Sequence, residues 1–223
     1  MTSNKNILFF ILAALSLACF TGCSKSDEPV LLQGTGIVLD FAGTGHCSVI
    51  IELDNGTRIQ PLYHPEGFDF TEGQRVAVEY FTLPDMVSSC GQGEVCNIVS
   101  ITETGCGSPL ILLNRDNYNI IPNDPVFLHD VDIKGDCLRV KVSFAGGCST
   151  HVFHLGLVQL GQDENGTALL ELRHDSKGDM CEAFLTKELS FNLEQLRKDD
   201  IRRIVFSATL LNGTTYTQEL ELE

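Results

Sequence analysis

Residues 48–62 read SVIIELDNGTRIQPL, in which two short runs rich in apolar and β-branched residues flank the pair Asn55-Gly56. Runs of this kind, bounded by turn residues, are typical of β-strands. Asn and Gly accept the positive φ angles that a type I′ turn needs at both central residues, so the stretch predicts a β-hairpin. Asn165-Gly166 and Asn212-Gly213 stand in similar surroundings and predict hairpins at 152–173 and 201–222. An all-β chain is therefore expected.

Around the first hairpin, the sequence predicts five strands and hence a small barrel. A Gly-rich turn at Gly43-Thr44-Gly45 follows the first strand, and Val76, Val78 and Tyr80 alternate as one face of the fourth. Five short strands of this kind predict an OB-like β-barrel domain over residues 31–104. Barrels of this class often bind ligands on an open face, although a closed barrel without a ligand is the simpler interpretation. The expected strands are 34–41, 47–54, 57–62, 75–83 and 94–103.

The second half of the chain predicts a β-sandwich. Residues 105–125 are rich in Gly, Pro and Asn and are interpreted as a connection, within which the apolar run 110–113 should pack as a strand against one domain. Seven short strands with turn signals between them then predict a β-sandwich domain over residues 126–223. Only the stretch 192–197 looks helical, and Asn192 and Gln195 have the spacing of an N-terminal capping box. The expected strands are 126–134, 137–145, 150–160, 167–173, 184–191, 201–212 and 215–222.

Residues 1–22 have the features of a bacterial signal peptide. Lys5 precedes an uncharged apolar run at 7–18, which is shorter than the roughly 20 residues of a transmembrane helix. The run leads into Phe20-Thr21-Gly22-Cys23, which resembles a lipobox. We therefore expect cleavage before Cys23 and acylation of its thiol, with residues 23–30 as a short polar tether. Cleavage without lipid attachment and acylation at Cys19 are the alternatives.

The net charge of the chain argues against one class of partner. The sequence has 30 acidic and 15 basic residues, and since residues 1–22 contain one base and no acid, the mature net charge is −16. Such a charge disfavours nucleic acid, which binds clustered Lys and Arg.

Asp27 and Glu28 resemble an export signal behind the lipidated residue, so the expected location is the outer membrane, lipid-anchored, at the cell surface. Retention on the inner leaflet is the alternative. The expected partners are the membrane, through the anchor, and a protein, peptide or glycan ligand, although the absence of Trp weakens the glycan interpretation.

Seven cysteines remain once Cys19 is removed and Cys23 is acylated. Outside the cytoplasm disulfides are the first expectation, and an odd number leaves at least one thiol free or paired between chains. Four of the seven fall in the first half, where they allow three pairings, and three fall in the second half. None has the C-x2-C spacing of a zinc site. The seven are Cys47, Cys90, Cys96, Cys106, Cys137, Cys148 and Cys181.

Two unusual stretches, GGCSTHVFH at 146–154 and HDSKGDMCEA at 174–183, are expected to meet at one end of the sandwich. We predict a disulfide between Cys148 and Cys181, closing a loop of about 30 residues and stabilising the fold by about 3–4 kcal/mol. His151, His174 and Asp179 form the candidate site beside it. The favoured interpretation is structural, with both imidazoles donating to Asp175 or Asp179 at the rim of the core.

A metal site or an enzyme centred on Cys148, His151, His174 and Cys181 is the sharper alternative. Zinc accepts two thiolates and two imidazoles, and a free Cys148 beside an imidazole could act as a nucleophile. Oxidation competes for these thiols, however, and the sequence has no G-x-S-x-G, H-E-x-x-H or Gly-rich phosphate motif. We therefore expect no catalytic residue, no metal and no cofactor, and interpret the protein as a binding or accessory module rather than an enzyme.

The whole layout resembles the NigD-like lipoproteins, which combine a lipobox, an N-terminal OB-like domain and a C-terminal β-sandwich. The resemblance implies this architecture but no biochemical activity. The family name comes from association with a bacteriocin gene cluster, so a bacteriocin-related protective protein is an alternative function. The residues that carry the resemblance are Cys47, Ile50 to Thr57, Pro61, Gly73 to Val76, Cys90, Ile98 to Thr102, Gly146 to Cys148, His151, Phe153, His174, Gly178-Asp179, Cys181 to Ala183 and Leu189 to Phe191.

Overall fold

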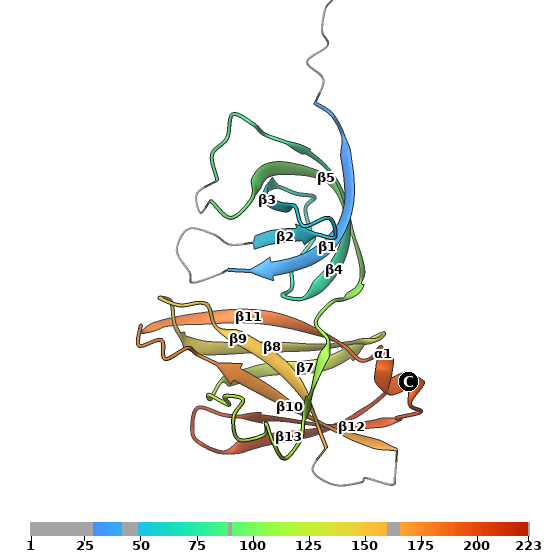
Figure 1. Ribbon diagram of the computed structural model, residues 1–223, viewed down its shortest axis with the longest axis vertical. Helices are drawn as coiled ribbons and strands as arrows, with labels where there is room; N and C mark the ends of the chain where they lie inside the picture. Colours follow the sequence, from blue (N-terminus) through green and yellow to red (C-terminus); the bar gives the residue numbers. More distant parts are fainter. Residues whose placement is uncertain (1–28, 42–48, 89–90, 160–165, 223) are drawn as a thin grey trace, which may run out of the picture.

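The computed structural model describes residues 29–41, 49–88, 91–159 and 166–222. Over these ranges the chain forms thirteen strands and one short helix, arranged as a barrel above a sandwich (Figure 1). The predicted fold class, a small OB-like barrel followed by a β-sandwich, is confirmed. The expected signal peptide and the expected lipidation site, Cys23, lie outside the described residues. Within the described ranges, no helix is long and apolar enough to span a bilayer.

The barrel closes in the order β1-β2-β3-β5-β4. Side chains that alternate along its strands fill the interior, among them Val38, Ile51, Ile59, Val76 and Val78, because successive residues of a strand face opposite sides of the sheet. The strands are β1 (Leu32–Asp40), β2 (Val49–Leu53), β3 (Arg58–Tyr63), β4 (Gln74–Thr82) and β5 (Glu94–Cys106).

The sandwich packs a five-stranded sheet, in the order β13-β12-β10-β9-β6, against a three-stranded sheet, in the order β11-β8-β7. Buried side chains of both sheets, such as Phe144, Leu170 and Phe206, form its core. The three-stranded sheet lies next to the barrel, and the five-stranded sheet forms the far layer (Figure 1). The elements are β6 (Leu110–Leu113), β7 (Phe127–Lys134), β8 (Cys137–Gly146), β9 (Val152–Val158), β10 (Thr167–Asp175), β11 (Ala183–Asn192), α1 (Glu194–Lys198), β12 (Arg203–Thr209) and β13 (Thr215–Glu221).

The stretch expected to be a connection, 105–125, holds the end of β5 and all of β6. The apolar run packs as a strand, as predicted, and it pairs in parallel with β9 at the edge of the five-stranded sheet. The fully buried Leu113 lies over Gly156, where a Cβ atom would come within 2.2 Å of the leucine Cδ1. Only glycine therefore lets β6 and the segment after it lie this close to β9.

The hairpins at Asn55-Gly56 and Asn212-Gly213 are confirmed, but the predicted type I′ turn is wrong for both. Each loop has three residues: Leu53 N–H donates to the Thr57 carbonyl, and Leu210 N–H to that of Thr214. Only the glycines have positive φ, +84° and +79°. Loops of this length need one left-handed residue at the last position, so the Asn is free to accept a hydrogen bond from the N–H two residues on.

Two further expectations are corrected. Asn165 lies outside the described residues, but a two-residue turn there would pair Leu157 with His174, whereas Leu157 pairs with Leu170. In the helix, Asn192 is not the cap, because Leu193 holds that position and no side chain caps α1. The Asn192 side chain instead accepts the N–H of Glu194 at 2.7 Å.

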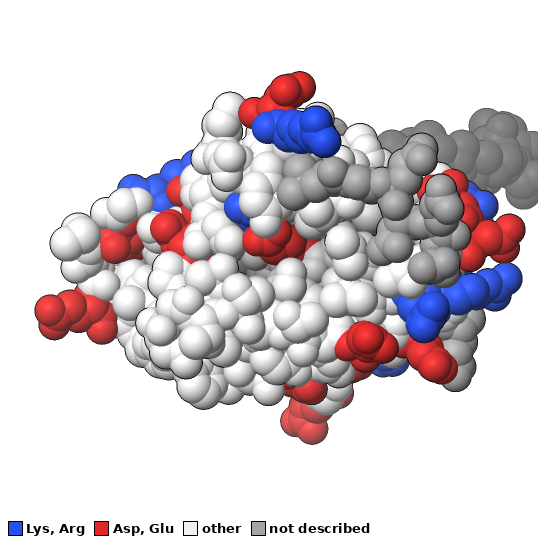
Figure 2. Space-filling model, turned by 90° about the horizontal axis from the view of Figure 1, so that it is seen from below, with Lys and Arg blue, Asp and Glu red and all other residues white. Residues whose placement is uncertain are grey.

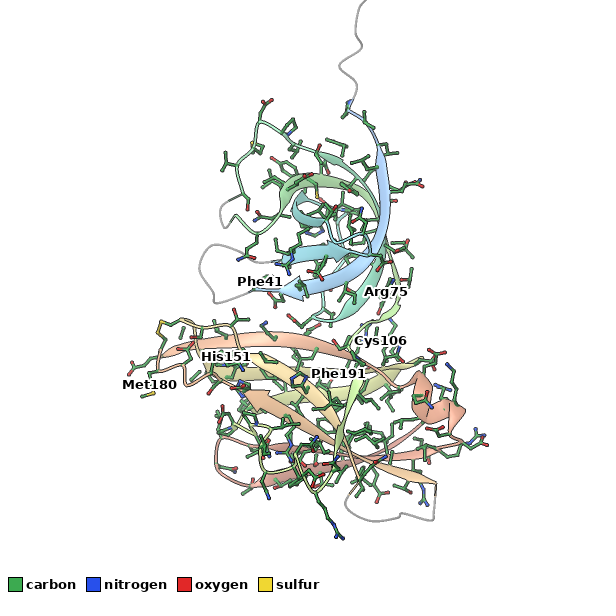
Figure 3. All side chains as sticks on the ribbon, viewed as in Figure 1. Phe41, Arg75, Cys106, His151, Met180 and Phe191 are labelled. Atoms are coloured by element: carbon green, nitrogen blue, oxygen red, sulfur yellow. A yellow bond between two sulfur atoms is a disulfide. The ribbon has the colours of Figure 1, made fainter. Side chains whose placement is uncertain are left out.

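Strand β11 joins the two units. Glu72 N–H donates to the Glu188 carbonyl and Ser190 N–H to the Glu72 carbonyl, which adds a short bridge between barrel and sandwich. A disulfide between Cys106 and Cys137 reinforces this junction (Figure 3). The sequence left the partner of Cys106 open, and only pairings within the first half were considered. The sequence suggests no such pairing because the end of β5 meets the start of β8 only in the assembled molecule.

Candidate functional site

The structure brings together the two unusual stretches of the sequence at one end of the sandwich. Gly146 and Ala183 are paired at the adjoining ends of β8 and β11, so the loops that flank them meet. Cys148 and Cys181 form a disulfide with a Cα–Cα distance of 5.9 Å. This is the pairing that the sequence analysis predicted.

The carboxylate of Asp179 organises both loops. Its Oδ2 accepts the backbone N–H groups of Gly147, Cys148 and Ser149 at 2.8–2.9 Å, and its Oδ1 accepts that of Cys181 at 2.9 Å. The N–H of Cys181, followed by those of Cys148, Ser149 and Gly147, holds the pKa of Asp179 well below its usual range, against the opposing effect of burial. Hydrogen bonds from four backbone donors favour the charged form of the Asp179 carboxylate, which in turn holds the two loops together.

His151 and His174 are in contact behind this carboxylate. Nδ1 of His151 lies 2.8 Å from Nε2 of His174, and its Nε2 lies 3.4 Å from Asp179 Oδ2. His174 stacks on Phe153, with ring centroids 4.5 Å apart. The expected contact of an imidazole with Asp179 is present, but Asp175 is not a partner: the second nitrogen of His174 faces the Asp124 carbonyl at 3.3 Å.

This cluster has the chemistry of a structural junction. The metal and enzyme hypotheses both require the thiols of Cys148 and Cys181, and the disulfide occupies both. Asp179 lies within 4.8 Å of the two sulfur atoms, but its oxygens are already used by backbone donors. The imidazoles are 5% and 3% exposed, out of reach of a substrate. Among the described cysteines only Cys96 is free, and burial raises the pKa of its thiol to about 12.

A pocket that the sequence analysis missed lies on the opposite face of the same strands. Arg173 of β10 pairs with His154 of β9, and both point away from the core, toward the segment that follows β6. The pocket between this segment and the sheet has a volume of about 660 Å³. Its lining is mostly aliphatic: Ile111, Leu112, Asn117, Ile120, Ile121, Pro122, Val152, His154, Arg173, Asp175 and Lys177.

A buried polar network holds the wall of this pocket in place. The Arg173 guanidinium lies 4.3 Å from the centroid of the Tyr118 ring and donates to the Ile121 carbonyl and to Glu171. Asn123 donates to the same carboxylate at 3.0 Å. Burial, and then the hydrogen bond to Glu171, raises the pKa of Tyr118. The network fixes the segment 118–123 over the sheet, so the pocket is preformed.

His154 is the polar group that the pocket leaves available. Its ring forms no hydrogen bond to any residue in the described ranges, whereas the terminal nitrogens of Arg173 donate to the Ile121 carbonyl and to Glu171, and the atoms of that network that stay unpaired, Arg173 Nε and Asn123 Oδ1, are buried. Burial lowers the pKa of His154, which keeps the ring neutral and able both to donate and to accept. At the rim, Lys177 is hydrogen bonded to Asp175, so these two charges offset one another.

The pocket continues into a sheet surface whose middle carries few charged groups. Outward-facing side chains of β10, β12 and β13 form this surface, which we term the outer face, and Figure 2 shows that charged groups lie mainly around its margin. Small and apolar side chains form the middle of this surface, and the exposed Arg203, Glu219 and Glu221 put charges at one end of it. The uncharged members are Thr167, Leu169, Val205, Ser207, Thr209, Thr215 and Thr217.

Comparison with known proteins identifies the family. The model of the NigD-like C-terminal β-sandwich domain matches residues 109–222, just over half of the chain. The chain belongs to the NigD-like family. The match begins at β6, in agreement with the place of that strand in the sandwich. No curated protein matches the sequence.

Several solved structures resemble this NigD-like chain along most of its length. A protein of unknown function from Bacteroides vulgatus is 20% identical, with a TM-score of 0.50 over 87% of this chain and 92% of that one. A protein described as toxin related, from Parabacteroides distasonis, is 19% identical (TM-score 0.46, 87% and 94%). A NigD-like immunity protein from Bacteroides caccae is 19% identical (TM-score 0.44, 88% and 98%). At these identities the first match supports the two-part fold alone.

The pocket of this NigD-like protein gave only a faint signal in the sequence. Glu171 and Arg173 put charges into an otherwise apolar strand, TALLELRHD, and could have marked a polar site. Alternating charges on a strand usually mean a solvated face, however. Recognising a pocket would have required placing Tyr118 and Ile120 over that face, which depends on the parallel pairing of β6 with β9.

Proposed function

We propose that this NigD-like protein is a lipid-anchored extracytoplasmic module that binds a protein or peptide through the pocket and the outer face. The observation that carries the proposal is the preformed aliphatic pocket, which contains one neutral imidazole without a described partner. Pockets that bind ligands are mostly apolar, with few polar groups that fix orientation. An apolar side chain of the partner would fill the pocket, and His154 would hydrogen bond beside it.

The surroundings of the pocket favour a protein or peptide over a glycan. The side chain of Ile120 is 76% exposed at its edge, and Leu112 is also exposed, so both offer apolar area to a partner. The centres of protein interfaces are depleted of charged groups, as the middle of the outer face is. Sugar binding uses open aromatic platforms, whereas the ring of Tyr118 stacks with Arg173.

We propose that the module acts by binding and not by catalysis. Cys148, the candidate nucleophile, is joined to Cys181 in a disulfide, and the two imidazoles beside it are buried. A catalytic cysteine needs a thiolate beside an accessible base. Measuring free thiols in the unreduced ectodomain tests this point, because a free Cys148 would reopen the enzyme hypothesis.

The proposed location is the outer membrane, with the ectodomain at the cell surface. It rests on the lipobox at 20–23 and the acidic residues behind it. The intact mass of the membrane-extracted protein should show Cys23 as an acylated N-terminus, and Cys23→Ala should release the chain from the membrane fraction. Protease treatment of intact cells should degrade the ectodomain if it faces outward and spare it if it faces the periplasm.

The binding proposal is tested by quantitative capture with three versions of the soluble ectodomain, residues 24–223. Ile120→Asp puts a charge at the edge of the pocket, and Val99→Asp is the matched control because Val99 is 50% exposed on the barrel. A specific partner should be retained by the wild type and the control, and captured at least tenfold less by Ile120→Asp. Equal capture by all three would contradict the use of this pocket.

Protection against a bacteriocin is the second candidate, and family membership is what favours it. A strain that lacks the gene should then be more sensitive to the toxin, and expression of Ile120→Asp should fail to restore resistance. Unchanged sensitivity of the deletion strain would exclude this role while leaving the binding proposal to the capture experiment.

A further inference from the structure

The end of the barrel where the chain enters carries exposed apolar side chains from two segments. We term this end the barrel tip and define it as residues 30–32 and 83–87. Val30 is 73% exposed and Val87 is 92% exposed, and Leu31 and Met86 are about half exposed. Both segments lie at the top of Figure 1.

The sheet pairing shows why these segments lie together. Strand β1 pairs antiparallel with β4, with Leu32 opposite Tyr80. The residues before β1 therefore run alongside the end of β4, from which the loop 83–87 leaves. This loop begins with a turn in which Met86 N–H donates to the Leu83 carbonyl. The apolar side chains thus lie at the same end of the barrel, on a chain that is otherwise strongly acidic.

We propose that the barrel tip rests on the lipid bilayer, as a second, non-covalent membrane contact beside the acyl anchor. This inference depends on the proposed lipidation of Cys23. An extended chain spans at most about 3.5 Å per residue, so the seven steps from Cys23 to Val30 keep the tip within roughly 25 Å of the anchor. An apolar surface held at this distance meets the interface of the membrane before any other part of the protein does.

The charges near the tip select the kind of lipid surface. Asp85 lies between Leu83 and Met86, and the tether contains Asp27 and Glu28. Like charges repel, so the tip should favour zwitterionic headgroups over anionic ones. Contact through valine and methionine side chains requires only the apolar boundary below those headgroups.

Such a contact would orient the whole molecule. The sandwich lies at the end of the molecule away from the tip, and its five-stranded sheet is the layer furthest from the barrel (Figure 1). The outer face and its pocket would then point away from the membrane, toward an approaching partner.

The absence of Trp from the chain allows a direct test. Full-length lipidated protein carrying Val87→Trp is reconstituted into phosphatidylcholine vesicles, and its fluorescence is compared with that of the unlipidated ectodomain carrying the same change. The matched control is Met180→Trp, because Met180 is 91% exposed at an edge of the sandwich (Figure 3). We expect a blue shift and quenching by lipids with brominated acyl chains for Val87→Trp alone, both reduced by added phosphatidylglycerol.

Each outcome has a distinct meaning. If the full-length protein fails to float with the vesicles and its mass lacks the acyl chains, the proposed lipidation fails. If it floats but Val87→Trp has the same emission as in the soluble ectodomain, the tip does not contact lipid and the inference is overturned. A blue shift that already appears in the soluble ectodomain and rises with protein concentration would assign the tip to a second copy of the chain, which also overturns it.

Discussion

At the scale of single residues, Asp179 links two loops that the disulfide alone would leave loosely defined. Its carboxylate accepts four backbone N–H groups, which an amide cannot do, since one of its two terminal atoms is a donor. Asp179→Asn should therefore lower the melting temperature of the oxidised ectodomain by several degrees. Asp132→Asn, at an exposed position of β7, is the control and should change it little. Equal melting temperatures for both variants would contradict this role.

His174 gives the protein a pH-dependent stability. Burial, and then the charge of His151, lowers the pKa of His174 from 6.5 to about 4. The unfolded chain binds the proton first as pH falls, so the stabilisation is complete above pH 6.5 and is lost as pH drops toward 4. The free energy of unfolding should fall by about 2 kcal/mol between pH 7.5 and 5. Urea titrations at both values check this, and His174→Gln should show a clearly smaller fall.

These residues also show what the sequence can predict about a site. The pairing of Cys148 with Cys181 and the proximity of His151 and Asp179 followed from two loops expected to meet. The contact of His174 with the Asp124 carbonyl did not, because Asp124 belongs to the segment after β6. Partners separated by 50 residues leave no local pattern to read.

At the scale of elements, the hairpin loops depend on their glycines more than on their asparagines. A Cβ atom at Gly213 would meet no atom within 4 Å, so Gly213→Ala tests backbone conformation alone. The left-handed conformation should make this variant less stable by roughly 1–2 kcal/mol. Gly213→Asn should lose less, since Asn tolerates that conformation better. Chemical denaturation distinguishes the two, and equal losses would contradict the conformational explanation.

The packing of β6 on β9 predicts a coupled pair. Gly156→Ala would drive a methyl group into Leu113 and should cost about 1–3 kcal/mol. Leu113→Ala should cost about 2–5 kcal/mol through the cavity that it leaves. In the double variant the new methyl group enters that cavity, so its loss should be smaller than the two single losses combined. Additive losses in urea denaturation would show that the two side chains do not compete for this space.

Element types were predictable here, and element pairing was only partly so. The strands could be located from the alternation of apolar and polar residues and from the Asn-Gly pairs, because each of these signals is contained in a stretch of about ten residues. The register of β9 on β10 is not the one that a two-residue turn at Asn165-Gly166 would give, since Leu157 meets Leu170 and not His174. The two registers differ by an even number of residues and put the same faces together, so the apolar alternation does not distinguish them. Strand β6 was expected to pack, but its partner could not be named from a four-residue apolar run.

At the scale of the whole molecule, the junction of barrel and sandwich is the part of the structure that the sequence predicts least well. Lys187 is buried there and donates to the Asp40 carbonyl and to Glu72, whose pKa burial raises. Arg139 binds Glu103 through both carboxylate oxygens. Each contact joins residues from the two halves of the chain, so none appears as a motif in either half.

The Cys106–Cys137 disulfide should make this junction cooperative. It closes a loop of 31 residues that contains β6, the pocket wall and β7. In the chain-entropy model, replacing both cysteines by serine should lower the free energy of unfolding by about 3–4 kcal/mol. The bridge through Glu72 remains, so the folded arrangement should persist while the barrel gains the freedom to open first.

Hydrogen exchange measured by mass spectrometry can separate these effects. In the wild type, β4 and β8 should exchange in one cooperative opening, because the Cys106–Cys137 disulfide transmits unfolding of either unit to the other. In Cys106→Ser/Cys137→Ser, β4 should exchange faster than β8. The matched control, Cys148→Ser/Cys181→Ser, removes a bond within the sandwich and should speed exchange there without separating the two units. If β4 and β8 still exchange together after loss of the junction disulfide, the hydrogen bonds of β11 alone make the molecule cooperative.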